Sequence, residues 1–368
     1  MIEWNIVIGF LLAIILVVIN GVTQLIYAQS LGYKLKPTSL AYFVGAFGNT
    51  LTGNVVPIAA QAETLTISGL IKKMNVRVAA LLIASIVGII MGAFSLLSTF
   101  VDFAGESIIY GMMAGVGLLL SDTALQLMKK RKRVGILSIV LAFLVWVFTK
   151  DLIYTIAASV LISTIDFTFI QKKRVEIDTT HDTGDSLNPK SNNDWTFVKP
   201  LFNLQALLGG LSLICLNIGT NISFGTITSS IANKTPNFDH ISLINSIADI
   251  PSILLGGMPI ETIISGTAAT HWPVLAGIIM MLTTGLLIFT GIIQKIGRYV
   301  PAESISGFLL VIGFSLTLIP NLIFISSADD AVDGFVSASV TVLTKNAFIG
   351  IVVALLVRFI RVFGGISL

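Results

Sequence analysis

Two glutamates lie just after proline-containing breaks in otherwise apolar sequence. Glu63 follows Gly53-Asn54-Val55-Val56-Pro57, and Glu261 follows Gly256-Gly257-Met258-Pro259. Proline fixes φ and lacks an N–H group, so a continuous helix is not expected at either place. The two breaks therefore predict short extended strands that lead into half-helices. A carboxyl group in an apolar setting resists ionisation, because it has lost the water that stabilises its charge. Such a group suits the uptake and release of a proton.

Other polar side chains in apolar stretches extend this candidate site. Amide and hydroxyl groups in 20–24 and 217–221 recur at spacings of three and four residues, which places each set on one helical face. They offer both donors and acceptors, as a planar heterocycle would require, while hydrogen bonding between helices is the open alternative. A structural role is equally open for Asp249 and for Glu261. The positive end of a helix dipole would stabilise the Glu261 carboxylate at the start of a half-helix. The full set of candidate substrate-binding or coupling residues is Asn20, Gln24, Gln61, Glu63, Asn217, Thr220, Asn221, Asp249, Glu261 and Ser265.

The amino-acid composition indicates the class of protein that carries these residues. Of the 368 residues, 55% are hydrophobic and only 11% are charged, whereas soluble domains carry about 25% charged residues. This excludes a soluble enzyme and a nucleic-acid-binding domain, and it predicts a multi-pass protein of the cell membrane. The single cysteine, Cys215, and the three scattered histidines match no metal-binding spacing. No metal site, catalytic residue or cofactor is therefore expected, apart from a proton or sodium as coupling ion.

The apolar segments predict an all-α protein of about 14 spans. They fall at 5–29, 38–53, 55–71, 77–98, 105–127, 134–149 and 151–170, and then at 203–226, 240–255, 257–271, 273–294, 301–319, 331–344 and 346–363. The polar stretch 171–199 predicts an exposed linker that is dispensable for transport, because it cannot bury a core.

The two halves of the chain resemble each other. Ala104-Gly105-Glu106-Ser107-Ile108 matches Pro301-Ala302-Glu303-Ser304-Ile305, with the glutamates 197 residues apart. Other short matches keep nearly the same offset, which indicates a duplication. Because seven spans is an odd number, the second copy must run through the membrane upside down, as is typical of secondary transporters. We therefore predict one repeat in 1–170, a linker in 171–199 and an inverted repeat in 200–368.

The region around the second break resembles xanthine/uracil permeases and the adenine/guanine–hypoxanthine permeases. The residues concerned are Asn245-Ser246-Ile247-Ala248-Asp249 and Gly256-Gly257-Met258-Pro259-Ile260-Glu261-Thr262, together with 109–120 and 298–313. The resemblance implies a core domain (spans 1–4 and 8–11) that moves against a gate domain (spans 5–7 and 12–14). Sulfate permeases share this architecture. The family often has an acid in span 8 and another six residues after the span 10 proline. This chain has Cys215-Leu216-Asn217 and Ser265 there, so coupling would fall to Glu63 and Glu261 or be absent.

Two indications of orientation disagree. Most of the 22 basic residues fall in loops that the positive-inside rule assigns to the cytoplasm, and this would place both termini outside. The resembled family keeps both termini in the cytoplasm, so orientation stays open.

The leading functional expectation is a proton-coupled transporter of a nucleobase-like solute. The alternative is a sulfate-permease-type transporter of an inorganic or organic anion, since half-helix N-termini favour anions. The partners expected are a small solute and the lipid bilayer, without nucleic acid, and a homodimer is open. An intramembrane enzyme and a non-transporting scaffold are the weaker alternatives from other classes.

Overall fold

The computed structural model describes residues 4–150, 154–155, 157–171, 195–297 and 300–363. The predicted linker lies largely outside these ranges. Six of the described helices are long and apolar enough to cross a membrane, at Ile6–Ser30, Met74–Ala93, Glu106–Lys130, Lys132–Thr149, Leu204–Ile231 and Glu303–Ser326. The chain is therefore a largely helical, multi-pass membrane protein, as predicted.

The first half of the chain begins with two long helices and then breaks. Its elements are α1 (Trp4–Ser30), α2 (Leu35–Thr52), β1 (Ile58–Ala59), α3 (Ala62–Gly69), α4 (Met74–Ala93), α5 (Leu96–Ala104), α6 (Glu106–Lys130), α7 (Lys132–Thr149) and the helical run 157–171 that contains α9 (Ile162–Ile165). Gly53 ends α2 with a φ of +66°, a left-handed conformation that glycine adopts without strain. The break predicted after residue 53 is thus present, and α3 is the half-helix that follows it.

The second half has the same order with a shorter helix after its break. Its elements are α11 (Leu204–Ile231), α12 (Phe238–Leu254), β2 (Glu261–Thr262), the 3-10 turn η3 (Gly266–Ala269), α13 (Pro273–Phe289), α14 (Ile292–Gly297), the continuous helical run 302–326, α17 (Ala331–Thr344) and α18 (Ala347–Phe363). Within 302–326, α15 is Ser306–Leu310, η5 is Val311–Leu318 and α16 is Ile319–Ser326. The second half-helix is therefore only a single turn, because Gly266 disfavours a helix and Pro273 already begins the next one.

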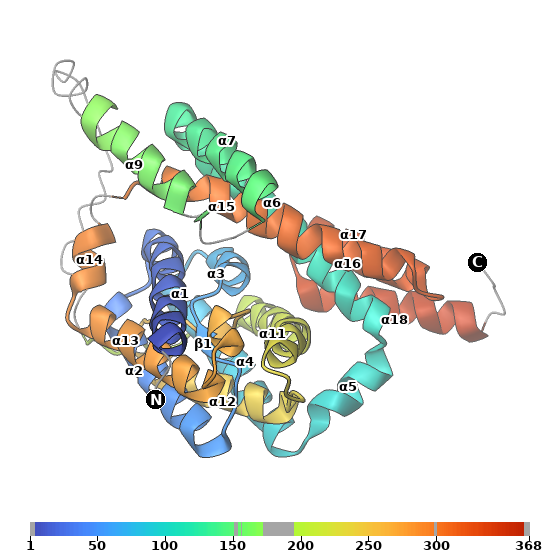
Figure 1. Ribbon diagram of the computed structural model, residues 1–368. Helices are drawn as coiled ribbons and strands as arrows, with labels where there is room; N and C mark the ends of the chain where they lie inside the picture. Colours follow the sequence, from blue (N-terminus) through green and yellow to red (C-terminus); the bar gives the residue numbers. More distant parts are fainter. Residues whose placement is uncertain (1–3, 151–153, 156, 172–194, 298–299, 364–368) are drawn as a thin grey trace.

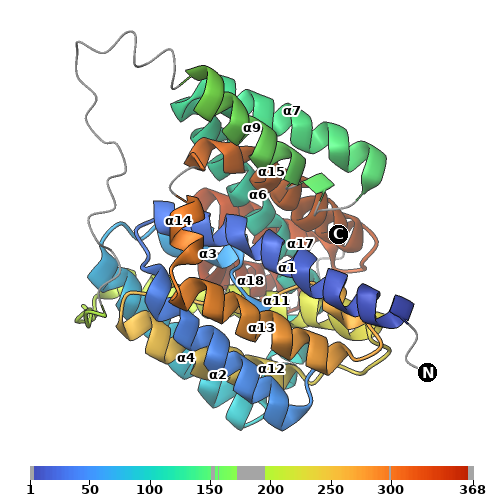
Figure 2. The same ribbon diagram turned by 60° about the vertical axis from the view of Figure 1, so that its left-hand side comes forward.

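The helices form two groups that α5 connects (Figure 1). The first group contains α1–α4 and α11–α13, and the second contains α6, α7, α9 and α15–α18. Within the first group α2 packs against α13 and α4 packs against α12, and these two pairs are the ones that an inverted repeat would exchange. Figure 2 shows α7, α9 and α15 of the second group above α1 and α13 of the first. The symmetry relation and a movement of the groups as core and gate domains stay predictions.

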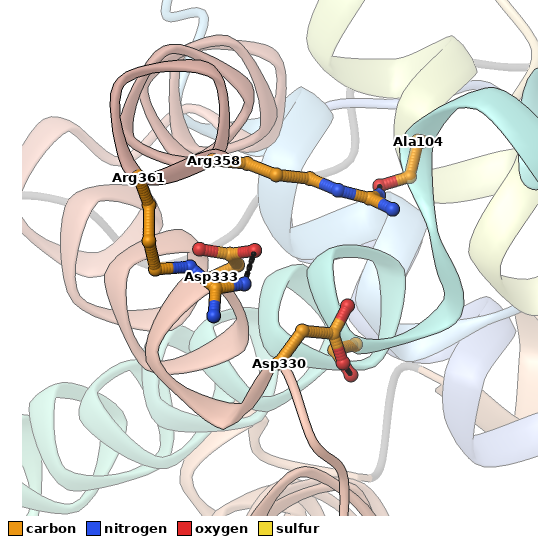
Figure 3. Close-up of polar contacts among 6 residues, drawn as sticks. Ala104, Asp330, Asp333, Arg358 and Arg361 are labelled. Atoms are coloured by element: carbon orange, nitrogen blue, oxygen red, sulfur yellow. Dashed lines mark hydrogen bonds and ion pairs between the residues drawn. The ribbon is translucent and has the colours of Figure 1, made fainter. Parts of the chain in front are cut away.

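The second group is held by close packing and by charges. A Cβ atom on Gly111 of α6 would collide with the backbone oxygen of Gly334 on α17, so the two helices touch through their glycines. At the end of this contact, the Arg361 Nη2 atom of α18 lies 2.8 Å from Oδ2 of Asp333, which is fully buried (Figure 3). Arg358 of α18 donates to the carbonyl oxygen of Ala104 (2.9 Å). These contacts tie α18 to α17 and to the corner between α5 and α6.

The last residues of the predicted linker are not free in solution. The Val198 N–H group donates to the Leu254 carbonyl (2.8 Å), and the Leu201 N–H group donates to the Asn75 carbonyl (3.0 Å). Lys34 donates to the side chain of Thr196. Residues 195–199 therefore touch the first group through these bonds, while Trp195, Thr196, Phe197 and Lys199 remain exposed, as expected of this stretch.

Candidate functional site

The two breaks meet in a small antiparallel ladder at the centre of the first group. Strand β1 pairs with β2, with Ile58 opposite Thr262 and Ala59 opposite Glu261. The Ile263 N–H group donates to the Pro57 carbonyl (3.3 Å) and extends the ladder. Each strand thus satisfies backbone groups that the other would leave unpaired in a water-poor region.

Side chains complete the hydrogen bonding of this non-helical backbone. Asn49 of α2 donates to the Val56 carbonyl (2.8 Å), and the Tyr42 hydroxyl accepts from the Ala60 N–H group (3.0 Å). The Gln61 amide donates to the Thr262 carbonyl (3.0 Å) and accepts from the Thr64 hydroxyl (2.7 Å). Gln61 therefore links the start of α3 to strand β2.

Glu63 lies in the first turn of α3, next to a pocket between the two helix groups. It is 3% exposed, and its carboxyl oxygen Oε1 accepts from the Thr317 hydroxyl of η5 (3.2 Å). The pocket encloses about 80 Å³. Its lining residues come from α1, both broken segments, α11 and η5: Val17, Gly21, Gln24, Ala59, Ala60, Gln61, Glu63, Phe224, Ile263, Ile264, Ile312, Leu316 and Thr317. This volume is far below the 300–1,000 Å³ of pockets for drug-sized ligands, so it suits a small solute.

The polar groups of this pocket converge from three elements. Gln24 of α1 is buried, and its Oε1 atom has no hydrogen-bond partner among the described residues. The first N–H groups of any helix lack partners within the helix, and the Gln61 side chain does not cap those of α3. The unpaired Gln24 oxygen and the start of α3 therefore lie at a mostly apolar cavity, which is the pattern of a binding site for a small polar solute.

Glu261 lies in a second polar cluster beside β2. It is 1% exposed, and its Oε2 atom accepts from the Asn245 amide of α12 (3.3 Å). The same amide group donates to Asn221 and to the Thr262 hydroxyl, both at 2.9 Å. Asn217 of α11 also lies within hydrogen-bonding range of Glu261. This network joins α11, α12 and β2.

The remaining predicted site residues have local partners. The Asp249 carboxylate accepts from the Ile260 N–H group (2.8 Å), which holds the strand entry against α12. The Thr220 hydroxyl donates to the Asn217 carbonyl (3.1 Å) of its own helix. Ser265 caps the 3-10 turn by accepting from the Thr267 N–H group (3.2 Å). The side chain of Asn20 lies outside the described residues.

The structure thus separates the predicted residues into two places. Gln24, Gln61 and Glu63 line the pocket, whereas Glu261 is not among its lining residues and lies on strand β2 rather than at a helix start. That both glutamates line one cavity stays a prediction.

Sequence reasoning gave no role to Thr317, which contacts Glu63. It is one of two hydroxyl residues, with Ser315, in the otherwise apolar run 308–319, and this was the available signal. Asn245 was noted only as part of a motif, although it lies one helical turn before Asp249 on the same face.

No family model matches the chain, and no curated protein matches it. Solved structures do. The transmembrane domain of a cyanobacterium bicarbonate transporter, BicA, superposes with a TM-score of 0.65 at 13% identity, over 95% of this chain and 98% of that one. The overall structure of SLC26A9 gives a TM-score of 0.68 at 12% identity, over 97% of this chain and 65% of that one. The murine Slc26a9 anion transporter in its inward-facing state gives 0.60 at 13% identity, over 97% and 68%.

These neighbours are transporters, in keeping with the expectation of a transporter rather than an enzyme, and they do not single out the xanthine/uracil permeases. They contradict the leading expectation of nucleobase transport and favour its alternative, since the solved structures are titled as a bicarbonate transporter and an anion transporter. At this low identity, the likeness establishes that the chain has the fold of these membrane transporter domains.

Proposed function

We propose that the chain is a secondary transporter of a small anion, of sulfate-permease type. The observation that carries the proposal is the pocket at the start of α3, which lies between two helix groups in a fold found in anion transporters. A site between two groups of helices can be exposed to each side of the membrane in turn.

The start of α3 supplies the recognition chemistry. The N-terminus of a helix carries unpaired N–H groups and the positive end of the helix dipole, and both favour an anion. Ala60, Gln61 and Glu63 line the pocket at this end. The pocket has room for a small ion such as bicarbonate, a halide or sulfate.

Glu63 makes the proposal more specific. An ionised carboxylate in the first turn of α3 would repel an anion in the same pocket, and the low polarity of the surroundings strengthens that repulsion. The anion and a proton on Glu63 therefore favour each other. We accordingly infer that a proton, rather than sodium, accompanies the anion.

The test is uptake by proteoliposomes that contain the purified protein. Labelled bicarbonate, sulfate, chloride and uracil are each offered with an inward proton gradient, with a sodium gradient or with neither. We expect uptake of at least one anion, faster under the proton gradient, and no uptake of uracil. Correctly inserted protein that transports none of the anions would refute the proposal, and stimulation by sodium alone would refute the coupling.

A further inference from the structure

Arg77 of α4 is a buried cation that the proposed site does not use. It is 3% exposed, and it is the one lysine or arginine whose side chain is buried among the residues with described burial. Its Nε atom donates to the Ile71 carbonyl (3.0 Å) and its Nη1 atom donates to the Leu31 carbonyl (2.7 Å). The guanidinium carbon lies 4.8 Å from the centre of the Tyr33 ring.

These contacts place the charge at the ends of two helices. Leu31 directly follows α1, and Ile71 follows α3 by two residues. Helix C-termini expose carbonyl groups and carry the negative end of the dipole, so a cation is stabilised there. Within the described residues no carboxylate forms an ion pair with Arg77. Its charge is therefore solvated by carbonyl groups and an aromatic ring rather than by a directly paired carboxylate.

Helix α3 connects this charge to the pocket. Its eight residues span about 12 Å, with Arg77 at the C-terminal end and the pocket at the N-terminal end. Residues 62–68 are all buried, so the space between is filled by protein rather than by water. Charges interact over such a distance with little screening when water is excluded.

We propose that Arg77 is the positioning charge that makes this pocket select anions. Arg77 neutralises the negative, C-terminal end of the α3 dipole. The pocket then experiences the positive, N-terminal end of that dipole together with the charge of Arg77. This inference rests on the proposed function and adds the residue that sets its charge preference. A plain helix cap is the competing role, and it would support α3 without acting on the charge of the solute.

The charge of the substrate separates the two roles. A lost positive charge weakens the binding of a divalent anion about twice as much, in free energy, as that of a monovalent one. A unit charge at this distance corresponds to about a tenfold change in KM for a monovalent anion, and so to about a hundredfold change for a divalent one. A loosened cap would raise both KM values by the same factor.

The experiment compares R77Q with R77K in proteoliposomes, using bicarbonate or chloride and sulfate on the same preparation. R77Q should raise the ratio of divalent to monovalent KM about tenfold, and R77K should leave it within about threefold of the parent. Because the ratio is taken on one preparation, a lower yield of folded R77Q does not affect it. If the ratio of divalent to monovalent KM is the same in R77Q, R77K and the parent, the inference is wrong, although the protein is still an anion transporter. If the parent transports no anion, the proposed function itself fails.

A second pair leaves Arg77 in place. Leu70 is the C-cap residue directly after α3 and is 38% exposed, so it tolerates a polar substitution. L70D should raise the same ratio and L70K should lower it, each by about two- to threefold because water screens an exposed charge. If L70D and L70N give the same ratio, the charge at this end of α3 does not act on the pocket and the inference is wrong. Y33F serves as the control, because it removes the hydrogen bond to Ser68 and keeps the ring and the charge.

Discussion

The Thr317 hydroxyl of η5 donates a hydrogen bond of 3.2 Å to the carboxyl group of Glu63 on α3. The bond joins the second helix group to the first across the pocket. Protonation of Glu63 would therefore alter the contact between the two helix groups as well as the binding of the solute.

Replacing Glu63 by glutamine should abolish the pH dependence of uptake. An anion binds most readily when Glu63 is neutral, and lowering the pH raises the neutral fraction, so uptake by the parent should increase as the pH falls. In E63Q the group is neutral at every pH, so uptake at high pH should match the parent at low pH, without accumulation against a gradient. Initial rates from pH 5 to 9 check this. T317V is the control, because it removes the hydrogen bond and keeps the titrating group; an E63Q profile as steep as that of T317V would contradict the role.

Replacing Asn245 by leucine should destabilise the protein by about 2 kcal/mol, since several buried polar groups lose their donor. The groups concerned lie on Asn221, Glu261 and Thr262. The midpoint of unfolding in detergent measures the effect. The control is N237A. Asn237 caps the start of α12, where its side chain accepts from the His240 N–H group. Losing this cap alone should cost about 1 kcal/mol of stability. Equal effects of the two variants would argue against a network at Asn245.

Replacing Gly111 by alanine should separate α6 from α17. The added Cβ atom meets the backbone oxygen of Gly334, which cannot move without its helix. Overpacking of this kind costs about 1–3 kcal/mol, and we expect the upper part of that range. G9A is the control, because nothing lies within 4 Å of its Cβ position. The measurement is the melting temperature. If G111A changes it as little as G9A does, the two helices adjust to the added methyl group.

Replacing Asp333 by asparagine should destabilise the end of α17 by about 3 kcal/mol, because Arg361 keeps a partly buried charge without its partner. The exposed Asp329 supplies the control D329N, which should change the unfolding midpoint little. The double variant D333L/R361L should recover most of the loss, since it removes both charges. A double variant less stable than D333N would contradict this account.

Deleting residues 175–190 should leave uptake nearly unchanged, whereas V198P should reduce it. Proline removes the N–H group that Val198 donates to Leu254 and so releases the docked part of the linker. V198A keeps the N–H group and is the control. Uptake normalised to the amount of protein in the membrane is the measurement, and a deletion that abolishes uptake at normal expression would show that the segment is required.

Much of the architecture follows from local sequence signals. The apolar runs locate the spanning helices, and Pro57 and Pro259 mark the two strands, because length and missing N–H groups act within a few residues. The end of α13 was harder to predict. The predicted segment 273–294 is interrupted at Gly291, which has a φ of +78°. The limits of a helix depend on such conformations, and apolar composition does not reveal them.

The site was predictable in its residue types and not in its arrangement. The apolar setting and the matching breaks made Glu63 and Glu261 candidates, yet how the two broken segments meet depends on the register of β1 and β2. Register is set by partners about 200 residues away, and a shift by one residue reverses the faces. The contact with Thr317 likewise depends on how the two helix groups meet.

The pairing of β1 with β2 also has a consequence for biosynthesis. Strand β1 and Gln61 belong to a segment that is made early, while their partners Glu261 and Thr262 leave the ribosome about 200 residues later. During that interval the backbone groups of Ile58 and Ala59 that pair with β2 lack these native partners in a lipid environment that does not hydrate them. The first half therefore cannot reach its final structure as it is inserted. It must wait at the translocon, or beside it, until the second half arrives.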